Sequence, residues 1–314
     1  MKISFIVPAY NTESTIKQAV ESIFNQKGDY LIEVIIVDDG SRDGTLDIAE
    51  ELKSRFPNIF VIHQDNSGEA SALNAGLDRA SGEIIAIVEA DVEIEEYWLK
   101  KVLKRFKDER VMGVGGRLIT PKDDPWIARL AGYEVEYKLR NNEEYPMHIT
   151  SANAIYRKEV FERFGRFDEQ LKNSCLDADL NLRIIKNNYK LCYVKEAVAL
   201  HHFKTNFLDY MKRQYAYARY RPYLRGAALY KTDYFLMFQI LLTGILLFSL
   251  PVCIIWPWST LSIFLVIILI QLPMTIRLLF AKKSIVVLYL PFLMVIRNIV
   301  GLTGYCVGLK LQKS

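Results

Sequence analysis

The chain has 314 residues, more than one compact domain of about 100–200 residues needs, so we expect two units. Hydrophobic residues make up 51% of the sequence and charged residues 24%, which excludes both a wholly disordered chain and one wholly embedded in a membrane. All 36 Asp and Glu residues lie at or before Asp233, so the first 233 residues carry a net charge of −2 and the last 81 carry +6. The excess positive charge therefore accompanies an apolar tail, and it gives no support for a nucleic-acid partner.

The first part of the chain alternates short β-branched or aromatic runs with stretches of helical composition. We expect strands at Ile3–Pro8, Glu33–Asp38, Ile59–His63 and Ile84–Glu89. Ser14–Asn25 and Asp43–Phe56 carry apolar residues at helical spacing, with Asp43 and Thr45 as cap candidates for the second helix. This alternation is typical of βαβ units and a parallel sheet, so the sequence predicts an α/β fold. In such a sheet the ligand lies beyond the carboxyl ends of the strands.

Polar residues gather at all four of those strand ends. The segments are Pro8–Glu13, Asp38–Thr45, Asn66–Gly76 and Glu89–Asp91. One such segment alone is an ordinary turn, but four in succession predict a single cleft. The chain has no P-loop, and Gly113–Gly116 is followed by Leu118 where a dinucleotide fingerprint needs its last glycine. Carboxylates in the cleft would repel a phosphate unless a divalent cation lay between them, so a diphosphate bridged by Mg²⁺ or Mn²⁺ is the expected ligand.

With these segments, the chain resembles the inverting nucleotide-sugar glycosyltransferases of family 2, which have the GT-A fold. The resemblance covers about residues 1–225. It rests on Ile6–Asn11, Val37–Thr45, Asn66–Gly76, Glu89–Asp91, Phe164–Glu169 and Leu176–Arg183, in this order. It implies a Rossmann-like GT-A domain with a mostly parallel sheet at residues 1–203, an Mn²⁺ or Mg²⁺ ion, and a UDP- or GDP-sugar donor.

The resemblance also implies roles for the polar residues of the cleft. Binding of the nucleotide sugar would fall to Pro8, Asn11, Glu13, Asp38, Asp39 and Asn74, with Asp38 or Asp39 reading the base. Glu89-Ala90-Asp91 stands where the family has Asp-x-Asp, so Asp91 would ligate the metal and Glu89 would contact the ribose. His201 or His202, after an expected strand at Lys190–Leu200, would complete the metal shell.

By the same resemblance, Asp177 is the expected catalytic base. It falls where the family has a Glu-Asp pair, although Leu176 replaces the Glu. An inverting transfer needs one carboxylate to accept a proton from the acceptor and one metal ion to offset the charge of the leaving diphosphate. A helix N-terminal cap is the structural alternative for Asp177. Ser151 and Asn153 are candidate contacts to the sugar or acceptor.

The last part of the chain predicts a membrane region, at residues 234–314. No charged residue or His occurs from Tyr234 to Ile276, and a helix needs only about 20 apolar residues to cross the hydrocarbon core. We expect crossings at about 234–255 and 260–280, joined by a turn at 256–259. A third apolar run, Ile285–Leu309, contains Pro291 and Arg297, and either spans or folds back as a hairpin. From the basic Lys282-Lys283 loop we expect the N-terminal domain on the cytoplasmic side, and the apolar run after Lys2, which ends at Ala9, is too short for a signal peptide and fits this expectation.

Between these regions, residues 204–233 alternate cations with aromatic residues and are expected to form an interfacial amphipathic segment. Arg219 and Arg221 could bind the donor diphosphate or a lipid phosphate, because guanidinium matches phosphate geometry. Processive polysaccharide synthases of the family carry Gln-x-x-Arg-Trp here, but after Gln214 this chain has Tyr217 and Ala218 at those two places.

The favoured hypothesis is therefore a multi-pass enzyme of the cell membrane that adds one sugar to a lipid-linked acceptor, such as a polyprenyl or dolichyl phosphate or a pyrophosphate-linked glycan. A processive polysaccharide synthase is one alternative. A second is a membrane scaffold that binds nucleotide sugars without turnover, in which Leu176 and Glu89 mark a decayed site. A nucleotidyltransferase is the third, and it would need a basic group near the first loop, which Pro8–Glu13 lacks.

Overall fold

The computed structural model describes residues 1–139, 143–203, 206–224, 233–249 and 257–311. The chain divides into two compact units, one formed by Met1–Pro121 and Asn141–Phe203 and the other by Lys122–Arg140 and Lys204–Ser314. Residues 122–140 fall in the second unit by this division, although they lie inside the domain expected at residues 1–203. The expected domain bounds stay a prediction.

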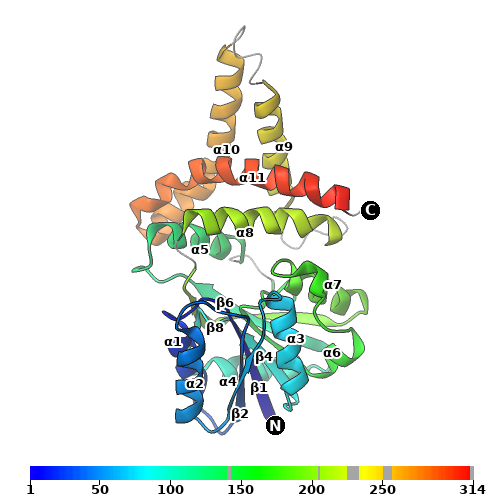
Figure 1. Cartoon of the computed structure of the whole chain (residues 1–314). Helices are drawn as coiled ribbons and strands as arrows, with labels where there is room; N and C mark the ends of the chain where they lie inside the picture. The colour runs from blue at the N-terminus through cyan, green and yellow to red at the C-terminus, as the bar shows by residue number, and fades with distance from the viewer. Residues whose placement is uncertain (140–142, 204–205, 225–232, 250–256, 312–314) are drawn as a thin grey trace. The chain divides into compact units, whose positions relative to one another are not determined.

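The first unit alternates strands and helices along the chain (Figure 1). Its elements are β1 (Lys2–Ala9), α1 (Ile16–Phe24), β2 (Leu31–Asp38), α2 (Thr45–Arg55), β3 (Ile59–His63), α3 (Glu69–Arg79), β4 (Ile84–Val88), β5 (Val92–Ile94), α4 (Trp98–Leu103), η1 (Lys104–Lys107), β6 (Val111–Ile119), β7 (Asn153–Arg157), α6 (Glu159–Arg163), η2 (Glu169–Leu171), α7 (Leu176–Lys186) and β8 (Lys190–His201). The four predicted strands and two predicted helices are confirmed within two residues at each end, and the strand predicted at Lys190–Leu200 is β8.

These strands form one sheet of eight, in the order β3-β2-β1-β4-β7-β6-β8-β5. Strands β1 to β4 pair in parallel, and the apolar runs of β1, β2 and β4 are almost fully buried, as expected for a sheet covered on both faces, whereas β3, the outermost strand, is only partly buried. The α/β class is confirmed. The sheet as a whole is mixed rather than mostly parallel, because β7 runs antiparallel to β4 and β6, and β5 runs antiparallel to β8.

The register of the sheet brings distant segments to one edge. The carboxyl ends of β1 to β4 lie at that edge because these strands are parallel. The amino end of β7 reaches the same edge, since Asn153 pairs with Val88 at the end of β4. Strand β5 follows β4 directly and pairs Val92 with His201 at the end of β8. The topology therefore collects the polar segments after β1, β2, β3, β4 and β8 around one site.

One buried carboxylate stabilises the opposite end of the parallel strands. Glu33 on β2 is 2% exposed; its carboxylate accepts hydrogen bonds from the Ser4 hydroxyl and the Ser81 backbone N–H, and it lies 2.7 Å from Lys2 Nζ. Burial raises the pKa of Glu33, but the donors from Lys2, Ser4 and Ser81 outweigh it and hold that pKa at about 2. The charged form of Glu33 is thus the one that ties β1, β2 and the turn before β4 together.

The second unit is all helical. Its elements are α5 (Trp126–Leu139), α8 (Phe207–Tyr220), η3 (Arg221–Leu224), α9 (Asp233–Ser249), α10 (Pro257–Lys282), η5 (Ile285–Tyr289) and α11 (Leu290–Leu311). Within this unit α9 and α10 lie side by side, while α11 runs across the base of this pair and packs along α8 (Figure 1). In the described residues, Leu261–Lys282 and Ile285–Lys310 are long and apolar enough to cross a membrane, and Phe238–Ser249 is a shorter apolar helix.

Two details of the apolar tail differ from the prediction. Residues 257–259, expected to belong to a turn, form the start of α10, and Pro257 suits the first helical position because its missing N–H has no partner there in any case. The third apolar run forms the short 3-10 helix η5, followed without a break by the long helix α11, and not a hairpin. Pro291 does not break that helix because it lies in the first turn. The predicted segment 250–256 lies outside the described residues.

Arg297, the cation inside this third run, is buried against α5. It is 5% exposed and forms an ion pair with Glu134, which is 3% exposed. Glu134 also lies 2.8 Å from Lys138 Nζ and accepts a hydrogen bond from the Tyr210 hydroxyl of α8 at 3.2 Å. The network therefore joins α5, α8 and α11, and it accounts for an arginine in an otherwise apolar helix.

A row of glycines on α11 allows α8 to approach closely. A Cβ added at Gly304 would lie 2.6 Å from the Tyr215 carbonyl oxygen and 3.2 Å from the Ala218 Cβ. A Cβ added at Gly308 would collide with the Arg219 carbonyl oxygen. Small residues at a helix contact let two backbones pack together. The spacing of these glycines thus explains why α8 lies along α11.

Candidate active site

The loops after β1 and β2 are joined by hydrogen bonds from predicted site residues. Asn11 has a left-handed backbone, with φ of 51°, and its side-chain oxygen accepts from the Arg42 N–H at 2.8 Å. Glu13 accepts from the Gly44 N–H at 2.7 Å. Asn11 and Glu13 are both exposed, whereas Pro8 at the end of β1 is partly buried. These residues form one wall of the site, and their contact with a nucleoside stays a prediction.

Asp38 and Asp39 are buried at the end of β2 and organise the neighbouring loops. The Asp38 carboxylate, 0% exposed, lies 2.7 Å from His63 Nδ1 and faces the Ser41 N–H at 3.3 Å. The Asp39 carboxylate, 4% exposed, accepts from the N–H groups of Ser67 and Gly68 at 2.8 and 2.9 Å. Asp39 therefore fixes the start of the Asn66–Gly76 segment against β2.

Asn74, another predicted nucleotide contact, binds the backbone of Phe167 in the Phe164–Glu169 segment. Its side-chain oxygen accepts from the Phe167 N–H at 3.1 Å, and its Nδ2 donates to the Phe167 carbonyl at 3.0 Å. From the other side, Arg183 donates to the carbonyls of Gly165 and Arg166 at 2.8 Å. The structure gives Asn74 a structural task, the positioning of the Phe164–Glu169 segment beside α3 and α7.

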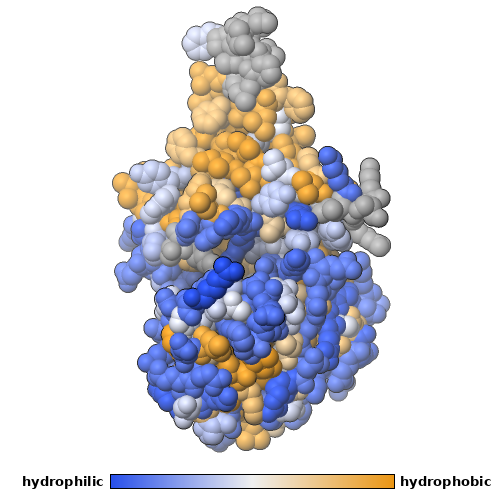
Figure 2. All heavy atoms as spheres, in the orientation of Figure 1, coloured by the Kyte–Doolittle hydropathy of each residue, from blue (hydrophilic) through white to orange (hydrophobic). Residues whose placement is uncertain are grey.

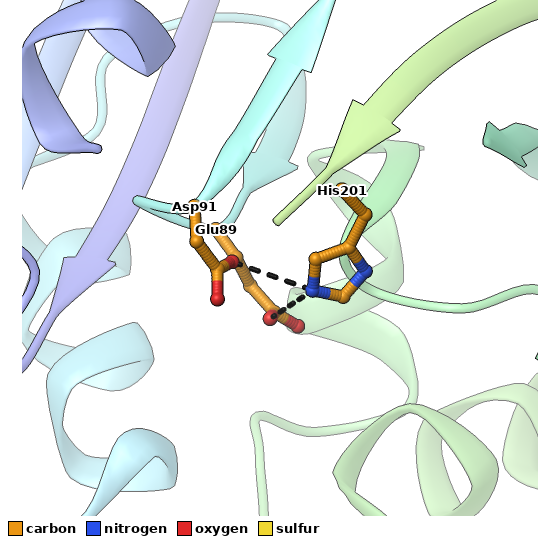
Figure 3. A group of neighbouring side chains, drawn as sticks. All are labelled: Glu89, Asp91 and His201. Carbon is orange, nitrogen blue, oxygen red and sulfur yellow. Dashed lines mark ion pairs between the residues drawn. The ribbon is translucent and has the colours of Figure 1, made fainter. Parts of the chain in front are cut away.

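Glu89, Asp91 and His201 form the group best suited to a metal ion (Figure 3). The Nε2 atom of His201 lies 3.4 Å from Asp91 Oδ1 and 3.8 Å from Glu89 Oε2, and one ligand atom from each residue falls within 4.8 Å of the others. The register of β5 on β8 creates this meeting, because Val92, next to Asp91, pairs with His201.

The chemistry of this group fits a divalent cation. His201 is 3% exposed, and neither of its ring nitrogens has a hydrogen-bond partner among the described residues. A buried imidazole without such partners is costly unless something binds it. One imidazole with two carboxylates is a donor set that suits Mn²⁺ and also Mg²⁺. Glu89, expected from the resemblance to contact a ribose, thus lies among the candidate metal ligands.

His202 lies outside this group. Its side chain contacts Glu93 Oε1 at 3.1 Å, and its backbone N–H donates to the Asp91 carbonyl at 2.9 Å. Successive side chains at a strand end point to opposite sides, so only one of two adjacent histidines can face the carboxylates. The geometry favours His201 over His202 as a metal ligand.

Asp177 lies in the first turn of α7 and is not its cap, since the cap position is Cys175. The Asp177 carboxylate accepts from the Ala178 N–H at 2.8 Å and from the Ser151 N–H at 3.3 Å. Ser151 stands two residues before Asn153, which pairs with the last residue of β4. Asp177 therefore lies at the same edge of the sheet as Glu89 and Asp91, with its side chain 21% exposed.

Three buried polar residues beside Asp177 were missed by sequence reasoning. They are His148, Tyr156 and Asn181, with exposed fractions of 4%, 0% and 0%. The sequence held one signal for them, since Asn181 follows Asp177 by four residues on the same helix and so shares its face.

Of the other predicted contacts, Asn153 lies inside the core. It is 0% exposed, its Oδ1 accepts from the Trp98 indole N–H at 2.6 Å, and its Nδ2 donates to the Arg117 carbonyl at 3.3 Å. Both ends of its amide are thus bonded within the protein, and its contact with a sugar or acceptor stays a prediction. Arg219 and Arg221 lie in the second unit, on α8 and at the start of η3, and their phosphate contacts stay a prediction.

The mixed α/β sheet thus carries, at one end of its strands, a carboxylate and imidazole group that could hold a metal ion and a separate carboxylate, Asp177. Residues 4–165 match the family described as glycosyl transferase family 2. That match covers half of the chain, and the chain belongs to this family. It is therefore a glycosyltransferase, with a GT-A-like fold.

Individual relatives match this chain over different shares of its length. The chain is 42% identical to EpsH of Bacillus subtilis over 107 residues, which covers 34% of this chain and only 31% of that relative. It is 26% identical over 98% of its length, and 97% of the relative's length, to a protein of Methanococcus voltae. That protein is named dolichyl N-acetyl-alpha-D-glucosaminyl phosphate 3-beta-D-2,3-diacetamido-2,3-dideoxy-beta-D-glucuronosyltransferase.

Among solved structures, the mannosyltransferase PcManGT from Pyrobaculum calidifontis, in complex with GDP-Man and Mn²⁺, is similar to this chain. The TM-score is 0.64 at 19% identity, and the match covers 97% of this chain and 87% of that one. At this identity the likeness establishes the fold alone.

Proposed function

We propose that the protein is a metal-dependent inverting glycosyltransferase that moves one sugar from a nucleotide sugar to a lipid-linked acceptor. The observation that carries this proposal is the meeting of Glu89, Asp91 and His201 at one sheet edge, with Asp177 at the same edge on a different element. A single-displacement transfer needs these two separate groups, one at the leaving diphosphate and one at the acceptor.

We assign a separate role to each group of residues according to its chemistry. A divalent cation, when bound, neutralises charge on the departing diphosphate. Glu89, Asp91 and His201 would hold that ion, and the loops fixed by Asp39 would hold the nucleoside. The Asp177 carboxylate would accept the proton of the attacking hydroxyl, and the N–H groups of Ala178 and Ser151 already fix its orientation. General-base assistance of this kind is typically worth about 10²–10⁴-fold in rate.

Two observations support a lipid-linked acceptor. The Methanococcus voltae relative, which matches this chain over nearly the full length, is named for a transfer to a dolichyl-phosphate-linked sugar. The second unit of this chain also carries helices long and apolar enough to cross a membrane. An acceptor that presents a sugar hydroxyl on a lipid carrier fits both, and it gives Asp177 a proton to remove.

We place the α9–α10 pair in the cell membrane and the first unit on the cytoplasmic side. Apolar side chains cover the outer surface of that pair, including Leu241, Phe248 and Leu269, whereas hydrophilic side chains dominate the face of the first unit (Figure 2). Lys282 ends α10 and Lys283 follows it, and this basic pair supports the orientation. Because α11 runs across the base of α9 and α10 and buries Arg297, we assign α11 and α8 to the membrane surface.

The proposal is tested with the full chain purified in detergent. The protein is incubated with Mn²⁺ and a panel of UDP- and GDP-sugars, with and without a polyprenyl-linked or dolichyl-linked sugar, and nucleotide release is followed together with the mass of the lipid. The proposal predicts that nucleotide is released only when a divalent cation, Mn²⁺ or Mg²⁺, and the lipid-linked acceptor are both present. The mass of the lipid should then increase by one sugar. A ladder of many sugars would support a processive synthase instead, and tight donor binding without release for any acceptor would support a non-catalytic scaffold.

A further inference from the structure

A buried chain of polar side chains leads from the core of the first unit to Asp177. The Tyr156 hydroxyl donates to Asn181 Oδ1 at 3.2 Å, Asn181 Nδ2 lies 2.9 Å from His148 Nδ1, and His148 Nε2 lies 3.6 Å from Asp177 Oδ2. These residues come from β7, α7 and the segment before β7, so the fold and not local sequence brings them together. We propose that His148 is a positioning residue for Asp177, which rests on the proposed role of Asp177 as base.

The hydrogen bonds of Asn181 determine which nitrogen of His148 carries a proton. Asn181 Nδ2 also donates to the Ile149 carbonyl at 2.6 Å, and a carbonyl oxygen can only accept, so this contact fixes the orientation of the amide. The second hydrogen on Nδ2 then points to His148 Nδ1, which must accept it. The proton of the neutral ring is therefore on Nε2, the atom that faces Asp177.

The far end of the chain holds this arrangement in place. Tyr156 is fully buried, and burial together with the charge of Asp177 raises the pKa of its hydroxyl well above the usual value. The hydroxyl therefore stays protonated and keeps donating to Asn181 Oδ1, which reinforces the amide orientation deduced from Ile149. All three residues are almost inaccessible to solvent, so no water competes for these contacts.

The consequence for Asp177 is an N–H group placed beside a carboxylate that already accepts two hydrogen bonds. The Ala178 N–H holds Oδ1, and the Ser151 N–H approaches Oδ2, the same oxygen that His148 Nε2 faces. At 3.6 Å the imidazole contact is longer than a hydrogen bond, so a small movement of either group on acceptor binding would complete it. His148 would then keep Oδ2 turned inward while Asp177 receives the proton of the acceptor.

The test uses two amide replacements that differ only in reach. His148→Asn keeps a polar group near the position of Nδ1, within reach of Asn181, but has nothing at the position of Nε2. His148→Gln extends to the position of Nε2 and keeps an N–H for Asp177. Asp177→Asn is the control for the base. Asn187→Ala is a control at the C-terminal end of the same helix, because Asn187 is exposed and its side chain donates to the Arg183 carbonyl, far along the helix from Asp177.

For each full-length variant, kcat and the donor KM are measured with the lipid-linked acceptor, and the Kd for the donor with Mn²⁺ and the melting temperature are measured alongside. We expect His148→Asn to lower kcat by about 10–100-fold, the range usual for groups that orient a functional side chain, with the donor Kd unchanged. His148→Gln should recover most of that loss, and Asn187→Ala should match the wild type.

A merely space-filling His148 would give a different pattern. Equal losses in His148→Asn and His148→Gln, or wild-type kcat in His148→Asn, would overturn the inference while an inactive Asp177→Asn left the proposed function standing. Wild-type turnover in Asp177→Asn would instead remove the base itself, and the proposed mechanism would fail irrespective of the His148 variants. If His148→Asn failed to fold, a His148→Gln variant with full kcat would support the inference and one with strongly reduced kcat would contradict it.

Discussion

The buried ion pair between Glu134 and Arg297 permits a quantitative prediction for the second unit. Replacing Arg297 with Met keeps the volume of the side chain but leaves the carboxylate of Glu134 buried with one partner fewer. Removal of one member of a buried ion pair costs about 3–5 kcal/mol. Lys138 and Tyr210 still contact Glu134, so we expect the lower end, about 3 kcal/mol. In domains of about 150–250 residues such a loss lowers the melting temperature by roughly 6–12 °C, and the somewhat smaller second unit should show at least that fall.

The assay is thermal unfolding of the full chain in detergent, for Arg297→Met, Glu134→Gln and the double variant. The double variant should recover more than half of the loss, because it leaves no unpaired charge in the interior. Lys212→Met is the matched control, since Lys212 forms an exposed pair with Asp209 on α8 and its loss should cost under about 1 kcal/mol. An Arg297→Met variant as stable as that control, or effects of the two single changes that simply add, would refute the reasoning.

Three further predictions concern the first unit. Asp91→Asn and His201→Leu should each abolish the Mn²⁺ dependence of donor binding, measured by calorimetry, whereas His202→Leu should retain it. The pKa of Glu33 is about 2 in the folded protein and 4.5 in the unfolded chain. The charged carboxylate therefore stabilises the fold above about pH 4.5, and this stabilisation is lost as the pH falls towards 2. The stability of a Glu33→Gln variant should accordingly depend less on pH over that window than the stability of the wild type. Asn74→Leu should lower the free energy of unfolding by about 1–3 kcal/mol, because it leaves the backbone of Phe167 without its partners, and an unchanged melting temperature would contradict this.

The parallel half of the sheet was predictable from the sequence because its information is local. Strands β1, β2 and β4 are buried on both faces, so each reads as a short apolar run, as the partly buried β3 also does, and the polar segments follow directly at the strand ends. The resemblance added Asp177, which no local pattern distinguishes from a helix cap. Strands β5, β6 and β7 were not predicted. The antiparallel pairing of β7 with β4 joins Asn153–Arg157 to Ile84–Val88, which are distant in the sequence, so no local pattern indicates it.

The choice between the two adjacent histidines needed the register of the sheet. Whether His201 or His202 faces Asp91 is decided by the pairing of β5 with β8, a contact between residues more than 100 positions apart. The burial of Asn153 could not be foreseen either, because its bonds to Trp98 and Arg117 join residues distant in the sequence. The partner of Arg297 was hidden for the same reason, because Glu134 precedes it by 163 positions.

The most direct test of the central claim is a comparison of Asp177→Asn with the wild type at saturating donor and acceptor. Donor affinity in the presence of Mn²⁺ is measured in parallel with the rate of sugar transfer to the lipid. The account predicts unchanged donor affinity and a kcat lower by about 10²–10⁴-fold. Wild-type kcat in Asp177→Asn would contradict the account, as would a loss of donor affinity that accounts for the whole loss of transfer.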